Sequence, residues 1–111
     1  MPPFDALKYI AAHNLKGNLL NDPTFGDVLM WNMENPPPLF LDTRFDAYPW
    51  QITKDYVAFR NGKENWQSIL QRYNINWIFI PANSPVCVQL SKQNSWHSIY
   101  KDDVAQIFTS E

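Results

Sequence analysis

Three charged side chains of alternating sign, Asp42, Arg44 and Asp46, follow the apolar run 39–41. Because successive side chains of an extended chain point to opposite faces, this spacing predicts a strand from Leu39 onward, with the charged groups on one face. A guanidinium flanked by two carboxylates can bind a polar or anionic group. Open α/β sheets commonly bind ligands just beyond the carboxyl ends of their strands, so this segment is the candidate binding site.

The same residues allow three interpretations, which stay open at this point. In the first, Asp42, Arg44 and Asp46 shape a polar site or an interface. In the second, the chain is a small independent enzyme in which Asp42 and Asp46 bind Mg²⁺ or Mn²⁺ and Arg44 binds an anionic group, although an arginine between the carboxylates repels a cation. In the third, Arg44 forms a purely structural ion pair with one of the two carboxylates.

Two other segments contain residues of chemical interest. Asp22 and Pro23 are typical of a helix start, where backbone N–H groups can bind an anion, but the segment has a single glycine and Asp27 adds a second carboxylate. An ordinary strand-to-helix turn is expected there. Cys87 falls near the start of a later helix, which can lower the pKa of a thiol, yet its two neighbours are valines and no histidine is close in sequence, so we expect no catalytic thiol.

Composition limits the class of protein. The chain has 111 residues, of which 45% are hydrophobic and 18% charged, as expected for one globular domain over residues 1–111. With nine basic and eleven acidic residues spread along the chain, no basic stripe is available for a nucleic acid. The single cysteine excludes an internal disulfide. No apolar run approaches the ~18 residues of a membrane span, so a water-soluble domain is expected.

Helical and strand patterns alternate along the chain. Apolar spacing, caps and glycines predict helices at about 4–13, from Asp22 onward, at 52–61, at 66–73 and after Ser84. Strands are predicted at 18–21, from Leu39, at 77–80, at 96–100 and at 104–109. This order predicts an α/β domain with a three-layer, Rossmann-like arrangement of about five strands, mostly parallel, with a C-terminal antiparallel hairpin.

A set of motifs along almost the whole chain resembles a known family. The motifs are LKYI at 7–10, NLKG at 14–17, FGDVLMW at 25–31, LDTRFDAY at 41–48, INWI at 75–78 and YKDDVA at 100–105. Together they resemble the C-terminal soluble domain of polytopic bacterial membrane proteins related to the C-superfamily glycosyltransferases, which use lipid-linked sugars. The most specific motif is Asp-Gly-Arg-x-Asp-x-Tyr, which Asp42, Arg44, Asp46 and Tyr48 match and from which Thr43 departs.

The resemblance implies an extracytoplasmic accessory domain, part of a larger membrane protein whose transmembrane part carries the glycosyl-transfer site. The domain would have a binding or capping role through Asp42, Arg44, Asp46 and Tyr48, with no catalytic residue, metal or cofactor of its own. Its expected partners are the transmembrane part of the same parent protein and a carbohydrate or lipid-linked sugar, and not nucleic acid. If Met1 is a native start, a cytoplasmic protein is expected instead.

Overall fold

A four-stranded mixed sheet forms the centre of the computed structural model, which describes residues 1–110. Its strands lie in the order β1-β2-β4-β3 and are β1 (Asn18–Asn21), β2 (Ile75–Pro81), β3 (His97–Lys101) and β4 (Ala105–Thr109). Strand β1 pairs with β2 in parallel, while β4 pairs antiparallel with both β2 and β3. The chain is therefore an α/β domain with one parallel and two antiparallel strand pairs.

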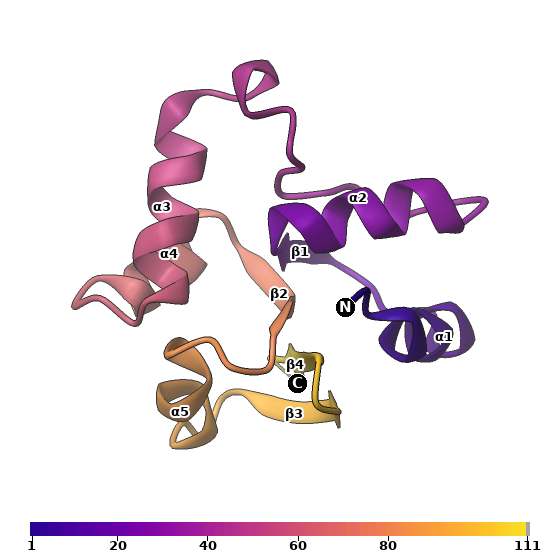
Figure 1. Ribbon diagram of the computed structural model, residues 1–111. Helices are drawn as coiled ribbons and strands as arrows, with labels where there is room; N and C mark the ends of the chain where they lie inside the picture. The colour runs from indigo at the N-terminus through magenta and orange to yellow at the C-terminus, as the bar shows by residue number, and fades with distance from the viewer. Residues whose placement is uncertain (111) are drawn as a thin grey trace.

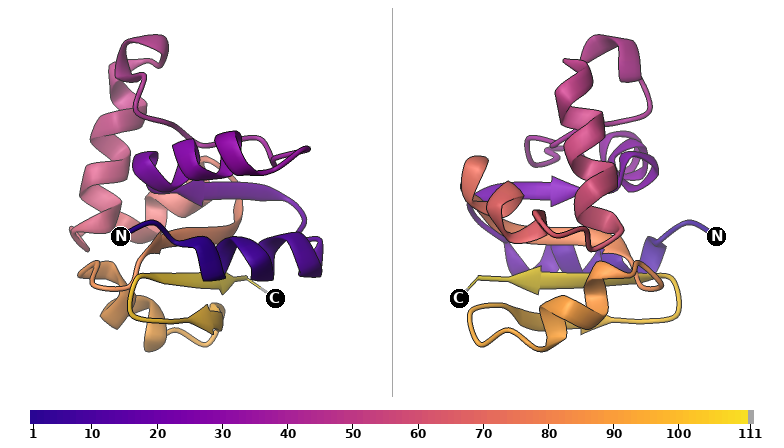
Figure 2. Two further views of the ribbon diagram at one scale, coloured as in Figure 1. Left: turned by 45° about the vertical axis from the view of Figure 1, so that its right-hand side comes forward. Right: turned by 90° about the vertical axis from the view of Figure 1, so that its left-hand side faces the viewer.

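Helices cover both faces of this sheet (Figure 1). They are α1 (Phe4–His13), α2 (Pro23–Asn32), the 3₁₀ helix η1 (Phe45–Ala47), α3 (Trp50–Arg60), α4 (Trp66–Arg72) and α5 (Val86–Ser91). Trp77 and Phe79 of β2 pack with α1 and α2, while Ile78 and Ile80 pack with α3, α4 and α5. This alternation gives the domain two hydrophobic cores, one on each face of the sheet. The two views in Figure 2 also show helices on both faces.

The predicted helix boundaries that rest on a capping residue are confirmed, as is the C-terminal hairpin. Asn14 ends α1 in the left-handed conformation, at φ 47°. Asp22 caps α2, its carboxylate accepting a hydrogen bond from the Phe25 N–H at 3.2 Å. The C-terminal antiparallel hairpin is present, and Asp102 stabilises its turn by accepting hydrogen bonds from the N–H groups of Val104 and Ala105.

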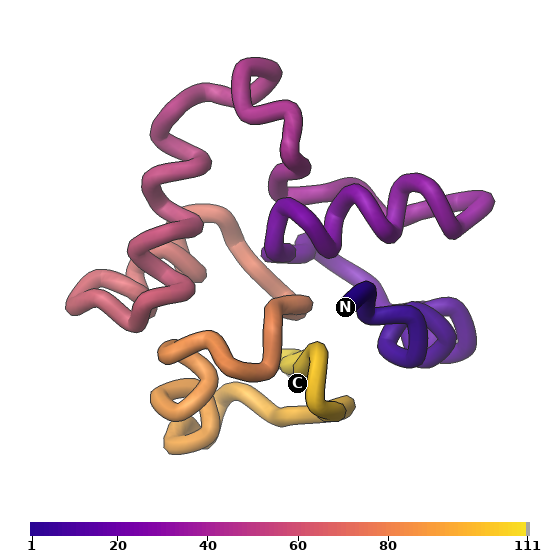
Figure 3. The backbone as a smooth tube through the Cα atoms, in the orientation of Figure 1, coloured from indigo at the N-terminus to yellow at the C-terminus, as the bar shows by residue number. Residues whose placement is uncertain are grey.

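The predicted strand from Leu39 onward is wrong. Between α2 and α3 the tube in Figure 3 follows a long irregular path, and residues 39–44 are neither helix nor strand. The Asn21 side chain, rather than a strand, hydrogen-bonds the backbone of Phe40 and Leu41. Three prolines at 36–38 lack the N–H donors that a longer ladder needs. The described sheet accordingly has four strands, not about five.

The predicted predominance of parallel pairing is also wrong. Strand β4 returns beside β2 in the opposite direction, with Phe79 opposite Ile107. The hairpin therefore joins the sheet antiparallel to β2, and β1 with β2 is the single parallel pair of the described sheet. Within residues 1–110, no helix has the length and apolar character of a membrane-spanning segment.

Candidate functional site

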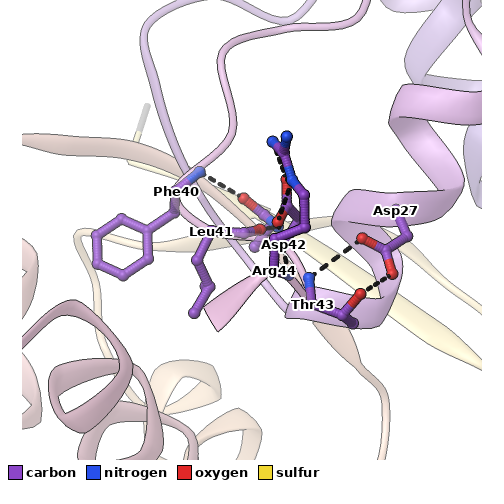
Figure 4. A network of polar contacts seen from close by, with 7 residues as sticks. Asp27, Phe40, Leu41, Asp42, Thr43 and Arg44 are labelled. Atoms are coloured by element: carbon purple, nitrogen blue, oxygen red, sulfur yellow. Dashed lines mark hydrogen bonds and ion pairs between the residues drawn. The ribbon is translucent and has the colours of Figure 1, made fainter. Parts of the chain in front are cut away.

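Asp42 and Arg44 form a tight ion pair next to α2 (Figure 4). The Asp42 carboxylate accepts hydrogen bonds from the Arg44 backbone N–H at 2.9 Å, from Nε at 3.2 Å and from Nη2 at 2.8 Å. The Asp42 side chain is fully buried, whereas 67% of the Arg44 side chain is exposed. The hydrogen bond from the Arg44 side chain lowers the pKa of Asp42, so the carboxylate is ionised at neutral pH and fixes the guanidinium.

Tyr48 belongs to the same cluster. It is half-buried, and its hydroxyl lies close enough to Asp42 to help, after Arg44, to lower the pKa of that carboxyl. Burial raises the pKa of Tyr48 itself, and the nearby Asp42 carboxylate adds to that rise. The structure thus brings together Asp42, Arg44 and Tyr48.

Asp46 lies apart from these three residues. The predicted common face of Asp42, Arg44 and Asp46 is wrong, because the chain turns into η1 at Phe45 and ends the extended geometry on which that prediction depends. Asp46 is exposed, and within residues 1–110 it makes no hydrogen bond or ion pair. In the same part of the chain, no group of three or more His, Cys, Asp or Glu side chains is placed to hold a metal ion. A contribution of Asp46 to binding stays a prediction.

Three residues that the sequence did not indicate as part of a site, Asn21, Gly26 and Asp27, position this cluster. Asn21 is fully buried; its Nδ2 donates to the Leu41 carbonyl at 2.8 Å, and its Oδ1 accepts from the Phe40 N–H at 2.7 Å. Asp27 of α2 accepts from the Thr43 N–H at 3.2 Å and from Thr43 Oγ1 at 2.5 Å (Figure 4). At Gly26 a Cβ atom would lie 2.6 Å from both Asn21 Nδ2 and the Leu41 oxygen.

These contacts explain how an irregular segment can hold a fixed geometry. Asn21 replaces a strand partner, Gly26 allows α2 to approach closely, and Asp27 anchors the turn. In the sequence, the only sign of this close approach is a glycine inside a helix, a position that often reflects close packing.

A hollow of about 380 Å³ opens beside the ion pair. Its walls are Asp27, Met30, Trp31, Thr43 and Arg44, and Trp31 is 83% exposed. We call this feature the Trp31–Arg44 hollow. It combines an aromatic surface with a fixed guanidinium, which are the two kinds of group most often enriched at binding surfaces.

Cys87 does not have the properties of a nucleophile. It is buried in the first turn of α5, and its Sγ lies 3.7 Å from the Pro81 carbonyl oxygen. Burial raises the pKa of the thiol to about 11. At neutral pH the group is therefore almost entirely protonated and poorly nucleophilic.

Stability should fall in acid, because three buried or half-buried carboxylates titrate below their ordinary pKa. Arg44 lowers the pKa of Asp42. Burial alone would raise the pKa of Asp55, but hydrogen bonds from Tyr73, Gln51 and Arg72 outweigh it. At Asp102 burial is outweighed in the same way by hydrogen bonds from the hairpin. Their folded pKa values lie below the unfolded values, so the stabilisation is complete above about pH 5 and is lost as pH falls below about 4. Urea unfolding between pH 7 and pH 2.5 measures this loss of stability. A free energy of unfolding at pH 3 equal to or greater than that at pH 7 would contradict the expectation.

Comparisons of the chain with protein-family models, with curated proteins and with solved structures find no match. The geometry of the site and the motifs at 41–48 are therefore the basis for a function.

Proposed function

We propose that this chain is a binding or capping domain, non-catalytic by itself, that belongs to a membrane glycosyltransferase-like protein and acts on its extracytoplasmic side. The observation that carries the binding role is the Arg44 guanidinium, held in place by the fully buried Asp42 while most of the Arg44 side chain stays exposed. A charged group that is fixed in advance binds a partner at a low cost in conformational entropy. The membrane context is supported by the motif that Asp42, Arg44, Asp46 and Tyr48 match.

The fold is compatible with a Rossmann-like origin, which we also propose. Helices on both faces of the sheet and the parallel pairing of β1 with β2 support this classification. The antiparallel addition of β4 and β3 is then a departure from the parent architecture.

A divalent metal at Asp42 and Asp46 fits the geometry less well. Both Asp42 oxygens already accept hydrogen bonds from Arg44, and Asp46 lies apart in η1. A cation at Asp42 would have to displace a guanidinium that is close to ideal in charge and geometry.

A purely structural role of the ion pair is the second candidate. It is favoured by the complete burial of Asp42, since removing the partner of a buried charge is costly. The domain contains a natural comparison, because Arg72 of α4 also pairs with a buried aspartate, Asp55 of α3, through a single hydrogen bond from Nη1 at 2.8 Å. Arg72 does not line the Trp31–Arg44 hollow.

Arg44→Gln is expected to reduce the activity of the full parent protein by about tenfold or more, while Arg72→Gln is expected to leave it nearly unchanged. Both changes remove the guanidinium partner of a buried aspartate, so the difference between them isolates binding from stability. Activity of the parent protein and the melting temperature of each variant are the measurements. Equal losses of activity that follow the melting temperatures would support the structural role and overturn the binding role.

The membrane context has its own test, which is the reading frame upstream of Met1. Several apolar segments of about 20 residues, with Lys and Arg biased to alternate loops, are expected there. A native start at Met1 without such segments would refute the proposed parent protein and leave only the binding role of Arg44.

A further inference from the structure

The indole of Trp31 offers a bare aromatic surface next to fixed polar groups. Trp31 lies in the last turn of α2 and is 83% exposed, and within residues 1–110 no other ring or cation stacks on it. Trp50 differs, because it is 70% exposed but Lys54 Nζ lies over its ring, 5.1 Å from the centroid. A large exposed aromatic ring is a favourable platform for an apolar ligand face.

Arg44 supplies hydrogen-bond donors at the edge of this platform. Its Nε and Nη2 are bound to Asp42 and Tyr48 lies close to it, yet 67% of the Arg44 side chain stays exposed. The guanidinium is therefore fixed on one side and open on the other. Thr43 Oγ1 and the carboxylate of Asp27 add acceptor oxygens to the same hollow.

The formal charges around the hollow disfavour an ionic ligand. Asp42 and Asp27 each carry one negative charge and Arg44 carries one positive charge, so the three together have a net charge of -1. A phosphate or carboxylate would meet Asp27, and a cation would meet Arg44. A neutral ligand that has many hydroxyl groups and one flat apolar face suits this arrangement better.

We propose that the Trp31–Arg44 hollow binds a neutral pyranose ring, with the C–H face of the sugar on the Trp31 indole. Sugar hydroxyls accept hydrogen bonds from the exposed side of the Arg44 guanidinium and donate to the oxygens of Asp27 or Thr43. The hollow of about 380 Å³ is large enough for one small ring. This inference rests on the proposed binding role of Arg44 and adds the class of ligand to it.

The experiment is an NMR titration of the ¹⁵N-labelled chain with methyl β-pyranosides of glucose, galactose, mannose and N-acetylglucosamine. The expected result is a saturable shift of the Trp31 indole N–H signal with at least one of these probes. Trp31→Ala is expected to weaken binding by about tenfold or more, and Trp50→Ala to change it less than twofold. Both side chains are exposed, so neither change should disturb the fold.

Three outcomes would overturn the inference. One is the absence of a saturable shift with all four pyranosides, and another is binding that persists in Trp31→Ala. The third is tighter binding of methyl β-glucuronide than of the matching glucoside, since the added carboxylate should be repelled by Asp27. Protection of the Trp31 indole in the full parent protein without any saccharide would instead identify a protein contact.

The two proposals can fail separately. Pyranoside binding without any effect of Arg44→Gln on the parent protein would overturn the accessory role alone. Arg44-dependent activity without pyranoside binding would overturn the assignment of the ligand alone.

Discussion

Asn21→Ala is expected to lower the free energy of unfolding by about 2–5 kcal/mol, the largest effect of a single polar substitution that we predict. The side chain is fully buried at the end of β1, and its amide takes the place of a neighbouring strand for Phe40 and Leu41. Removing the amide leaves the part-buried N–H of Phe40 and the buried carbonyl of Leu41 without partners, and each unpaired group costs about 1–3 kcal/mol. The ion pair of Asp42 with Arg44 follows directly in the chain and should lose its fixed position.

Urea unfolding followed by circular dichroism measures this effect. Asn32→Ala is the matched control, because the Asn32 amide also donates to a backbone carbonyl, that of Val28, but at an exposed position on α2. Its expected cost is below about 0.5 kcal/mol. Similar costs for Asn21→Ala and Asn32→Ala would show that the segment 39–44 does not depend on Asn21.

Gly26→Ala is expected to destabilise the domain by about 1–3 kcal/mol, against the ordinary preference of helices for alanine. The new Cβ would lie 2.6 Å from the Leu41 carbonyl oxygen and 2.6 Å from Asn21 Nδ2. The carbonyl is backbone and cannot rotate away, so α2 or the segment that carries Asp42 must shift. The same shift should weaken the contacts between Asp27 and Thr43.

Thr24→Ala, two residues earlier in the same helix, is the control that separates the effect of close packing on stability from the effect of helix propensity. Thr24 is exposed, so alanine there is expected to be neutral or slightly stabilising. Both variants are measured by the same urea unfolding. A stabilising Gly26→Ala would mean that α2 does not approach the segment 39–44 as closely as described.

Local signals in the sequence predict the helices and all four observed strands well, and only the fifth strand, from Leu39, is wrong. Asn14 tolerates the left-handed conformation that ends α1, and Asp22 with Pro23 fixes the start of α2. The apolar positions Trp66, Ile69 and Leu70 share one helical face and are buried. These features depend on residues close in the chain, which a periodic pattern can detect.

The segment 39–48 shows where such reasoning ends. Alternating apolar and charged residues indicate an extended chain, but whether it becomes a strand depends on a partner that is distant in sequence. Here the partner is the side chain of Asn21, and η1 then turns Asp46 away. The pairing of Asp42 with Arg44 was among the predicted alternatives, whereas the hollow beside Trp31 arises from the packing of α2 and has no signature in sequence.

The parallel pairing of β1 with β2 constrains the order in which the parts of this chain can fold. Asn18 bonds to Asn74 and Asn76, 56 and 58 positions along the chain, and every residue of the Asp42–Arg44 cluster lies inside the loop that this pairing closes. The hairpin of β3 and β4 needs no such closure and can form early. Closing the long loop costs chain entropy before any contact compensates for it. The binding segment should therefore be ordered late in folding, after β2 has joined the sheet.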